Sequence, residues 1–316
     1  MGIFLSSTVL AVALAQSPVL PPPPPSPPSD SARATLWARV TADSTDGPAW
    51  LDLGRHYLHA GIEYHNHRRP NPVDTMRAHA IFDTAQQAFA RAARWSPGTR
   101  TADSAQVFRV YSYGERAYVD WESGGGAAAA TLAWHALPQD LKLPPVLEEL
   151  GENLLRACPH QGILFTANEN DTQAAWYLRF GRGLRPDLMI VPYDRWRSDS
   201  VLRNRLLRDL KMRTPTLRAL GEGRAVCASM GFEHPPDERP AVKWNKRPLV
   251  WVSGRETKAD RVPAHDFVFA ALRLSIDQHD TWTPPVLALY SRSAAQVGAL
   301  CKPFETYGLG SAVGCR

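Results

Sequence analysis

The sequence predicts an α/β protein in which a helical region precedes a domain built on a parallel sheet. Two short runs of apolar or β-branched residues, Ile163–Thr166 and Leu188–Val191, have the length and composition of buried strands. A helix is predicted between them, over Thr172–Phe180, which makes the unit a strand–helix–strand crossover. The expected division is a helical region at residues 31–123 and a Rossmann-like α/β domain at residues 144–316.

A polar cluster follows the first of these strands and is the candidate ligand-binding site: Asn168, Glu169, Asn170, Asp171 and Thr172. Ligands of open α/β sheets bind beyond the carboxyl ends of the strands, where this cluster lies. Asn170 is expected to cap the helix, with Gln173 as its capping-box partner. The carboxylates of Glu169 and Asp171 disfavour phosphate at a helix N-terminus and suit a cation, a hydroxylated ligand or simple capping. Ligand contact and capping both stay open.

The helical region contains one repeat signature. Trp50, Leu53, Gly54 and Tyr57 have the spacing of the first helix of a tetratricopeptide repeat. The spacing of the second helix is matched by Ala85, Phe89, Ala92 and Pro97. The region therefore resembles a tetratricopeptide repeat, with an insertion of about 19 residues relative to a period of roughly 34. A single repeat cannot bury its own face, so it must pack on neighbouring elements.

Histidine and carboxylate side chains gather around this insertion: His56, His59, Glu63, His65 and His67. Such side chains bind zinc, but their spacing here matches no known zinc motif. A solvated loop between repeat helices is the preferred interpretation. The sequence also lacks a nucleophile elbow, a P-loop and the HExxH zinc motif. No catalytic residue, cofactor or metal is therefore predicted.

Several motifs resemble the soluble C-terminal domain of the bacterial DUF2723 family, which is related to transmembrane protein O-mannosyltransferases. They are Phe165-Thr166, Asn170-Asp171-Thr172, Trp176-Tyr177-Leu178 and Gly183–Asp187, together with the segments Pro284–Tyr290 and Phe304–Leu309 near the C-terminus. Two positions depart from the family pattern, since Asn168-Glu169 replaces Gly-Asp and Gln173-Ala174 replaces Phe-Pro. The family's multi-pass membrane region has no counterpart in this sequence, so the resemblance implies an accessory role.

The first 15 residues form an apolar run that ends in Ala13-Leu14-Ala15, the form of a signal-peptidase site. A short membrane anchor is the alternative, and it would be the only membrane contact. Residues 16–30 form a proline-rich linker. The expected location is therefore periplasmic or secreted. The net charge of +5 comes without a DNA-binding motif, so nucleic acid is set aside as a partner.

Four cysteines, Cys158, Cys227, Cys301 and Cys315, are compatible with one or two disulfides of unassigned pairing or with free buried thiols. Residues 124–143 begin with the low-complexity run GGGAAAA and are expected to be a linker. Later elements are expected as strands at Pro248–Val252 and Val286–Tyr290 and as a helix at Ala264–Ile276. The run Gly221–Asn245 is expected to be irregular.

Two classes of function follow from these features. The first is an exported, non-catalytic binding or scaffold protein whose partner is a protein or a glycan of the cell envelope. The second, suggested by the glycosyltransferase relatives, is an envelope enzyme or enzyme subunit involved in glycosyl transfer. The sequence does not identify the ligand or the partner.

Overall fold

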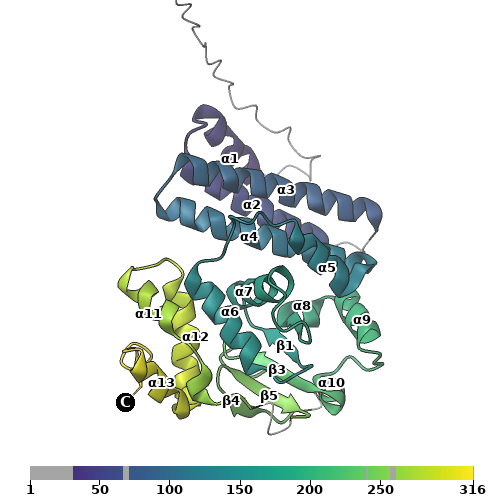
Figure 1. Ribbon diagram of the computed structural model, residues 1–316. Coiled ribbons are helices and arrows are strands. Elements are labelled where there is room, and N and C mark those ends of the chain that lie inside the picture. The colour runs from purple at the N-terminus through teal and green to yellow at the C-terminus, as the bar shows by residue number, and fades with distance from the viewer. Residues whose placement is uncertain (1–30, 67–70, 240, 257–260, 316) are drawn as a thin grey trace, which may run out of the picture.

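The computed structural model describes residues 31–66, 71–239, 241–256 and 261–315. The expected signal peptide, the expected linker at residues 16–30 and His67 lie outside these ranges. No helix within them is long and apolar enough to cross a membrane. The prediction of a mixed α/β protein is confirmed, with helices at one end of the molecule and the sheet at the other (Figure 1).

Four helices form the outer part of the helical end: α1 (Ser31–Ala42), α2 (Gly47–Asn66), α3 (Pro72–Trp95) and α4 (Arg100–Asp120). The residues of the repeat signature are buried where α2 and α3 meet, with Trp50 and Phe89 at 1% and 0% exposure. The exception is Pro97, which is exposed just after the end of α3. A Cβ atom at Gly54 would lie 2.5 Å from the Phe89 ring, so only glycine permits this approach. Tyr57 accepts a hydrogen bond from the indole of Trp37, which joins α1 to the pair.

The described residues of the histidine-rich insertion are not the expected loop, because they lengthen α2 and α3. The apolar face of α2 continues beyond Tyr57 through Leu58 and Gly61, which are buried against α3. The next helix begins directly after Asn71, whose side chain accepts hydrogen bonds from two backbone N–H groups of its first turn. The prediction of a solvated loop over this insertion was therefore wrong.

The segment expected to be a linker is largely helical. A π-helical turn, η1 (Trp121–Gly125), extends α4 and is followed by α5 (Gly126–His135). Alanine is the best helix former, which explains why the alanine run is helical. Gly124, at φ 122°, and Gly126, at φ 62°, supply the left-handed backbone at which the two helices meet. Trp134 then anchors α5, since it is 1% exposed.

The sheet has the strand order β2-β1-β3-β5-β4. Its strands are β1 (Ile163–Thr166), β2 (Met189–Pro192), β3 (Ala225–Ser229), β4 (Asn245–Arg247) and β5 (Val250–Gly254). Strands β2 and β3 both run parallel to β1, whereas β5 pairs antiparallel with β3 and with β4. The carboxyl ends of β1, β2 and β3 therefore lie at one edge. The predicted strands near β1, β2 and β5 are confirmed, but β3 lies within a run expected to be irregular.

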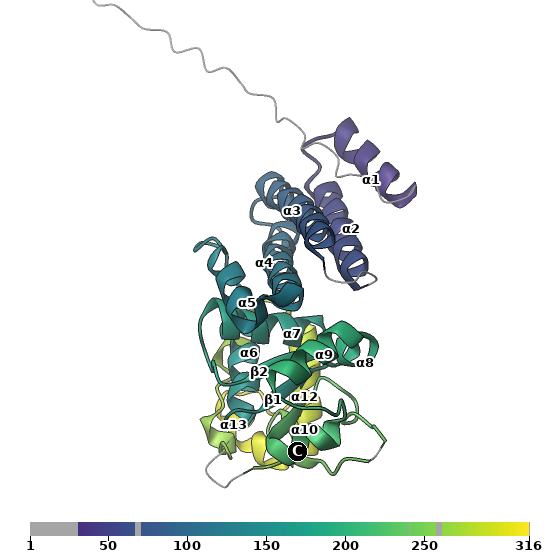
Figure 2. The same cartoon turned by 90° about the vertical axis from the view of Figure 1, so that its right-hand side faces the viewer.

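Helices surround this sheet, and the helical end of the molecule lies over α6 and α7 (Figure 2). They comprise α6 (Pro145–Ala157), α7 (Glu169–Trp176), the π-helical turn η2 (Tyr177–Gly181), α8 (Tyr193–Ser198), α9 (Ser200–Asp209) and α10 (Leu217–Gly223). Gly151 brings α6 close to α7, because a Cβ there would lie 2.6 Å from the carbonyl oxygen of Ala174.

The regular elements described in the C-terminal part are all helical: η4 (Ala264–Asp266), α11 (Ala270–Asp277), α12 (Thr283–Gln296), η5 (Gly298–Leu300) and α13 (Cys301–Thr306). The strand predicted at Val286–Tyr290 was wrong, since these residues belong to α12, which has prolines in its first turn. The helix predicted at Ala264–Ile276 is interrupted by extended backbone at Phe267. The Glu149 carboxylate accepts backbone hydrogen bonds from Ala271 and Leu272 and so caps α11.

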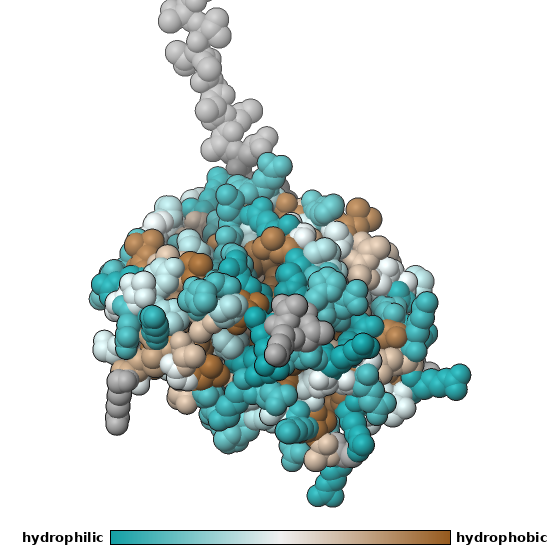
Figure 3. Space-filling view, turned by 60° about the horizontal axis from the view of Figure 1, so that its bottom comes forward, coloured by the Kyte–Doolittle hydropathy of each residue, from teal (hydrophilic) through white to brown (hydrophobic). Residues whose placement is uncertain are grey.

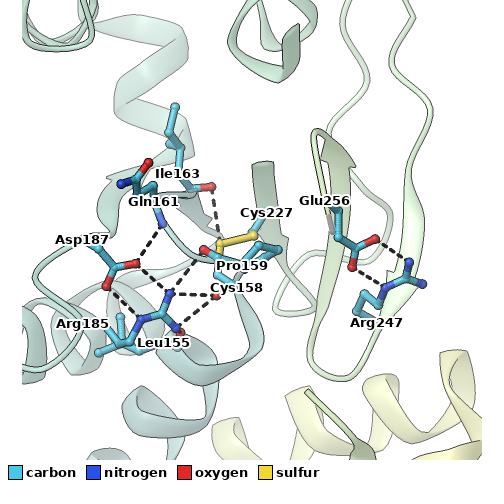
Figure 4. The surroundings of a disulfide bond; sticks show 10 residues. All are labelled: Leu155, Cys158, Pro159, Gln161, Ile163, Arg185, Asp187, Cys227, Arg247 and Glu256. Carbon is cyan, nitrogen blue, oxygen red and sulfur yellow. Dashed lines mark hydrogen bonds and ion pairs between the residues drawn. A yellow bond between two sulfur atoms is a disulfide. The ribbon is translucent and has the colours of Figure 1, made fainter. Parts of the chain in front are cut away.

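Two disulfides, Cys158–Cys227 and Cys301–Cys315, pair all four cysteines. The first joins the turn before β1 to β3, and Figure 4 shows Arg185 beside it, donating to the carbonyl oxygens of Leu155 and Cys158. Although burial opposes ionisation, hydrogen bonds from Arg185 and the Gln161 N–H hold the pKa of Asp187 at about 2. The turn is therefore fixed covalently and by an ionised carboxylate.

The face turned away from the helical end is mostly hydrophilic, and its apolar residues lie in small separate groups (Figure 3). Small apolar groups of this kind are normal on a protein surface.

Candidate functional site

The candidate loop is a capping box at the carboxyl end of β1. The Asn168 side chain accepts a hydrogen bond from the Asp171 N–H at 3.2 Å, and the Asp171 carboxylate accepts from the Asn168 N–H at 2.8 Å. The prediction that Asn170 caps α7 with Gln173 as its partner was wrong, because the cap is Asn168, two residues earlier, and its capping-box partner is Asp171. Burial raises the pKa of Asp171, which is 0% exposed, while hydrogen bonds from Ala167 and Asn168 oppose that shift. Asn168 and Asp171 therefore hold the loop in shape.

Two further residues of the loop are occupied by protein partners. The Thr172 hydroxyl lies 2.6 Å from that of Thr166 and donates to the Asn168 carbonyl oxygen. The Asn170 side chain accepts a hydrogen bond at 2.9 Å from the hydroxyl of Tyr111, a fully buried residue of α4. The loop is thus tied to the helical end of the molecule as well as to the sheet.

The strand order reverses at β1, because β2 lies on one side of it and β3 on the other, and a crevice at such a point is the usual ligand site. Here the loop after β3 fills it. A Cβ atom at Gly231 would lie 2.8 Å from Asp171 Oδ2 and 3.0 Å from the Ala167 Cβ. Arg292 donates to the carbonyl oxygens of Met230 and Gly231 and fixes the loop in this position. The open space therefore lies on the other side of β1, toward β2.

That space, which we call the polar cavity, has a volume of about 190 Å³. Its walls come from α2, α4, the β1–α7 loop and the residues after β2, so both ends of the molecule contribute. The lining residues are His59, Ile62, Asn66, Glu115, Ala167, Asn168, Glu169, Thr172, Gln173, Pro192, Asp194 and Arg195.

A buried ion pair forms one wall of the polar cavity. Arg195 Nη2 donates to both carboxylate oxygens of Glu115, at 2.9 and 2.8 Å, and both residues are at least nine-tenths buried. Gln173 Nε2 donates to the same carboxylate at 2.9 Å. The guanidinium also lies over the rings of Tyr118 and Trp176, 4.4 and 5.8 Å from their centroids. Arg195 Nη1 is buried without a hydrogen-bond partner among the described residues.

Glu169 differs from the rest of the loop, because its carboxylate makes no hydrogen bond or ion pair with any residue that the structure describes. Its side chain reaches solvent, yet it stands in a recess of the protein. The loss of surrounding water and the charge of Glu115 raise its pKa to about 7, against the opposing effect of Arg195. Glu169 is therefore a solvent-accessible carboxyl group that changes charge near neutral pH.

Of the five predicted residues, Asn168, Glu169 and Thr172 line the polar cavity, whereas Asn170 and Asp171 do not. The sequence prediction missed Glu115 and Arg195. The sequence contained one signal for Glu115. This carboxylate lies four residues after Tyr111 and three before Tyr118, which places it on the apolar face of a helix. A charge in such a position requires a buried partner.

The histidines of the histidine-rich insertion do not form one cluster in the described part of the structure. His59 lines the polar cavity, and His65 is buried in an ion pair with Glu122 of η1. Among the described residues, no three His, Cys, Asp or Glu side chains are grouped so that they could hold a metal ion.

Comparisons with protein-family models, with curated proteins and with solved structures returned no match for this chain. Inferences about its function therefore depend on the residues and geometry described above.

Proposed function

We propose that this chain is a non-catalytic binding protein of the cell envelope whose ligand, a glycan or a segment of a protein, contacts the polar cavity. The observation that carries the proposal is the Glu169 carboxylate, which has no protein partner among the described residues and stands beside a fixed ion pair. Carboxylate, amide and guanidinium groups around a small cavity suit a hydroxylated ligand, because each can exchange hydrogen bonds with hydroxyl groups.

The sequence resemblances support the same proposal. A tetratricopeptide-like helical region beside a Rossmann-like domain would offer two surfaces for one partner. The resemblance to the soluble domain of the DUF2723 family, together with the signal-peptide pattern, points to the cell envelope. The lengthened helix α2 forms part of the proposed site, because His59 and Asn66 belong to the wall of the polar cavity.

The experiment is a glycan-array and envelope-extract screen, followed by calorimetric titration of the ligand found. Glu169→Gln should weaken binding about 10- to 100-fold, as expected for the loss of a charged hydrogen bond. Glu222→Gln is the matched control, because this glutamate is exposed on α10 and does not line the cavity. Equal affinities of Glu169→Gln and the wild type would contradict the proposal.

An enzyme of glycan processing is the second proposal, and it is favoured by the position of Glu169, a carboxyl group without a described partner that lines the polar cavity. A carboxyl group with a pKa of about 7, as for Glu169, suits general acid–base catalysis at neutral pH. If this proposal holds, the purified protein should turn over an envelope glycan with a pH dependence near 7. The activity should disappear in Glu169→Gln while binding persists.

A further inference from the structure

A second cavity, lined mainly by aromatic and aliphatic residues, lies between the helical end and the edge strand β2. Its volume is about 220 Å³. We call it the aromatic cavity. The residues that carry the argument are Tyr118, Trp121, Ala130, Trp134, Trp176 and Arg224. It is separate from the polar cavity, since the two share only Pro192 among their lining residues.

The aromatic rings form an ordered wall. The ring of Tyr118 is nearly parallel to those of Trp121 and Trp176, with centroid distances of 6.4 and 5.7 Å. Trp134 meets Tyr177 edge to face at 6.1 Å. Large rings fixed by one another cannot move inward to fill the space. The cavity is therefore a preformed apolar volume.

Two irregular segments contribute to this cavity. Trp121 comes from η1, which contains Gly124 at φ 122° and forms the kink where α4 meets α5. Arg179 and Phe180 come from the π-helical turn η2, and such turns occur often at functional sites.

Two polar groups of the lining lack partners. The Trp134 indole N–H has no hydrogen-bond acceptor among the described residues, and the residue is only 1% exposed. Arg224 is half-buried, and its guanidinium makes no hydrogen bond or ion pair with a described residue. By contrast, Arg179 donates to the carbonyl oxygens of Pro186 and Leu188.

From this arrangement we infer that the aromatic cavity binds a medium-chain carboxylate, with the alkyl chain between the rings and the carboxylate oxygens facing Arg224. An apolar cavity of about 150 Å³ accepts benzene, so the volume here suits roughly nine ligand atoms. Octanoate has about this size, and its charge complements Arg224. The lining also contains the carboxylate of Asp187, but that group is paired with Arg185. This inference does not rest on the function proposed for the polar cavity.

The test uses octanoate, with 1-octanol as the neutral probe of equal chain length. Titration calorimetry should show saturable binding of octanoate to the purified protein and weaker binding of octanol. The terminally brominated 8-bromooctanoate should quench tryptophan fluorescence, because three tryptophans line the cavity. Absence of both the heat and the quenching would overturn the inference.

Variants locate the binding. Ala130→Phe fills the cavity and should weaken octanoate binding at least tenfold. Ala127→Phe, at the exposed rim of the cavity, should have the same effect and serves as the test if Ala130→Phe does not fold. Ala128→Phe is the matched control, because this residue is exposed on the same helix and lies outside the lining. Arg224→Met should reduce the preference for octanoate over octanol about tenfold. Unchanged affinity in every folded cavity variant would refute the assignment.

Discussion

The buried Glu115–Arg195 pair joins the helical end to the α/β part, and Arg195→Met tests its importance. The substitution removes two charged hydrogen bonds of 2.8 and 2.9 Å and leaves the Glu115 carboxylate buried with only Gln173 as a donor. Breaking a buried ion pair in this way costs about 3–5 kcal/mol of the free energy of unfolding. Urea denaturation followed by tryptophan fluorescence measures the loss. Arg208→Met, at an exposed position of α9, should stay within about 0.5 kcal/mol of the wild type.

A double-mutant cycle separates the interaction from the loss of packing. Glu115→Leu alone should cost about as much as Arg195→Met, because it leaves the arginine charge buried. Glu115→Leu combined with Arg195→Met buries neither charge, so its loss should be about 1–3 kcal/mol, chiefly from the unsatisfied Gln173 donor. A double variant that loses the sum of the two single losses would refute the reasoning.

Three further predictions concern stability. Asn168→Ala removes the cap of α7 and should cost about 0.5–2 kcal/mol in denaturant unfolding, whereas Asn168→Ser should restore most of it. Gly231→Ala should cost about 1–3 kcal/mol, because its Cβ would meet Asp171 Oδ2 at 2.8 Å; an unchanged melting temperature would show that the loops can separate. The pKa of Glu149 and of Glu169 is about 7 in the folded protein against 4.5 ordinarily, so the folded state binds more protons and stability should fall from about pH 5 to 8. Glu149→Gln should flatten that slope, and an unchanged slope would contradict the assignment.

Local patterns predicted the elements whose signals lie in one short stretch. Strands β1 and β2 and the first turn of α6 were found, because apolar runs bounded by turn residues or proline specify them. The same reasoning failed at Val286–Tyr290, since a short apolar run cannot distinguish a strand from a helix by periodicity. Strand β3 was missed because its sequence, AVCAS, is short and its small residues give little strand signal. Its place in the sheet depends on non-local pairing with β1 and β5.

In the candidate site, too, local sequence predicted some features and non-local contacts determine the rest. The position of the 168–172 loop follows from strand order, so the sequence could place it at the carboxyl edge of the sheet. Its surroundings could not be predicted, because Glu115 lies 58 residues from its hydrogen-bond partner Gln173 and 80 from Arg195. Which side of β1 is open depends on Gly231, whose close packing is visible only in the folded chain.

The disulfide between Cys158 and Cys227 encloses a chain segment with a sequence separation of 69. The candidate loop, Arg195 and strand β2 all lie inside this covalent ring. Closing a ring of this length stabilises the folded chain by about 4 kcal/mol through the entropy of the unfolded state. A protease that cuts the exposed chain between β2 and β3 would leave the two pieces connected. Under oxidising conditions a nicked molecule would thus stay in one piece, and it would separate only when a reductant is added.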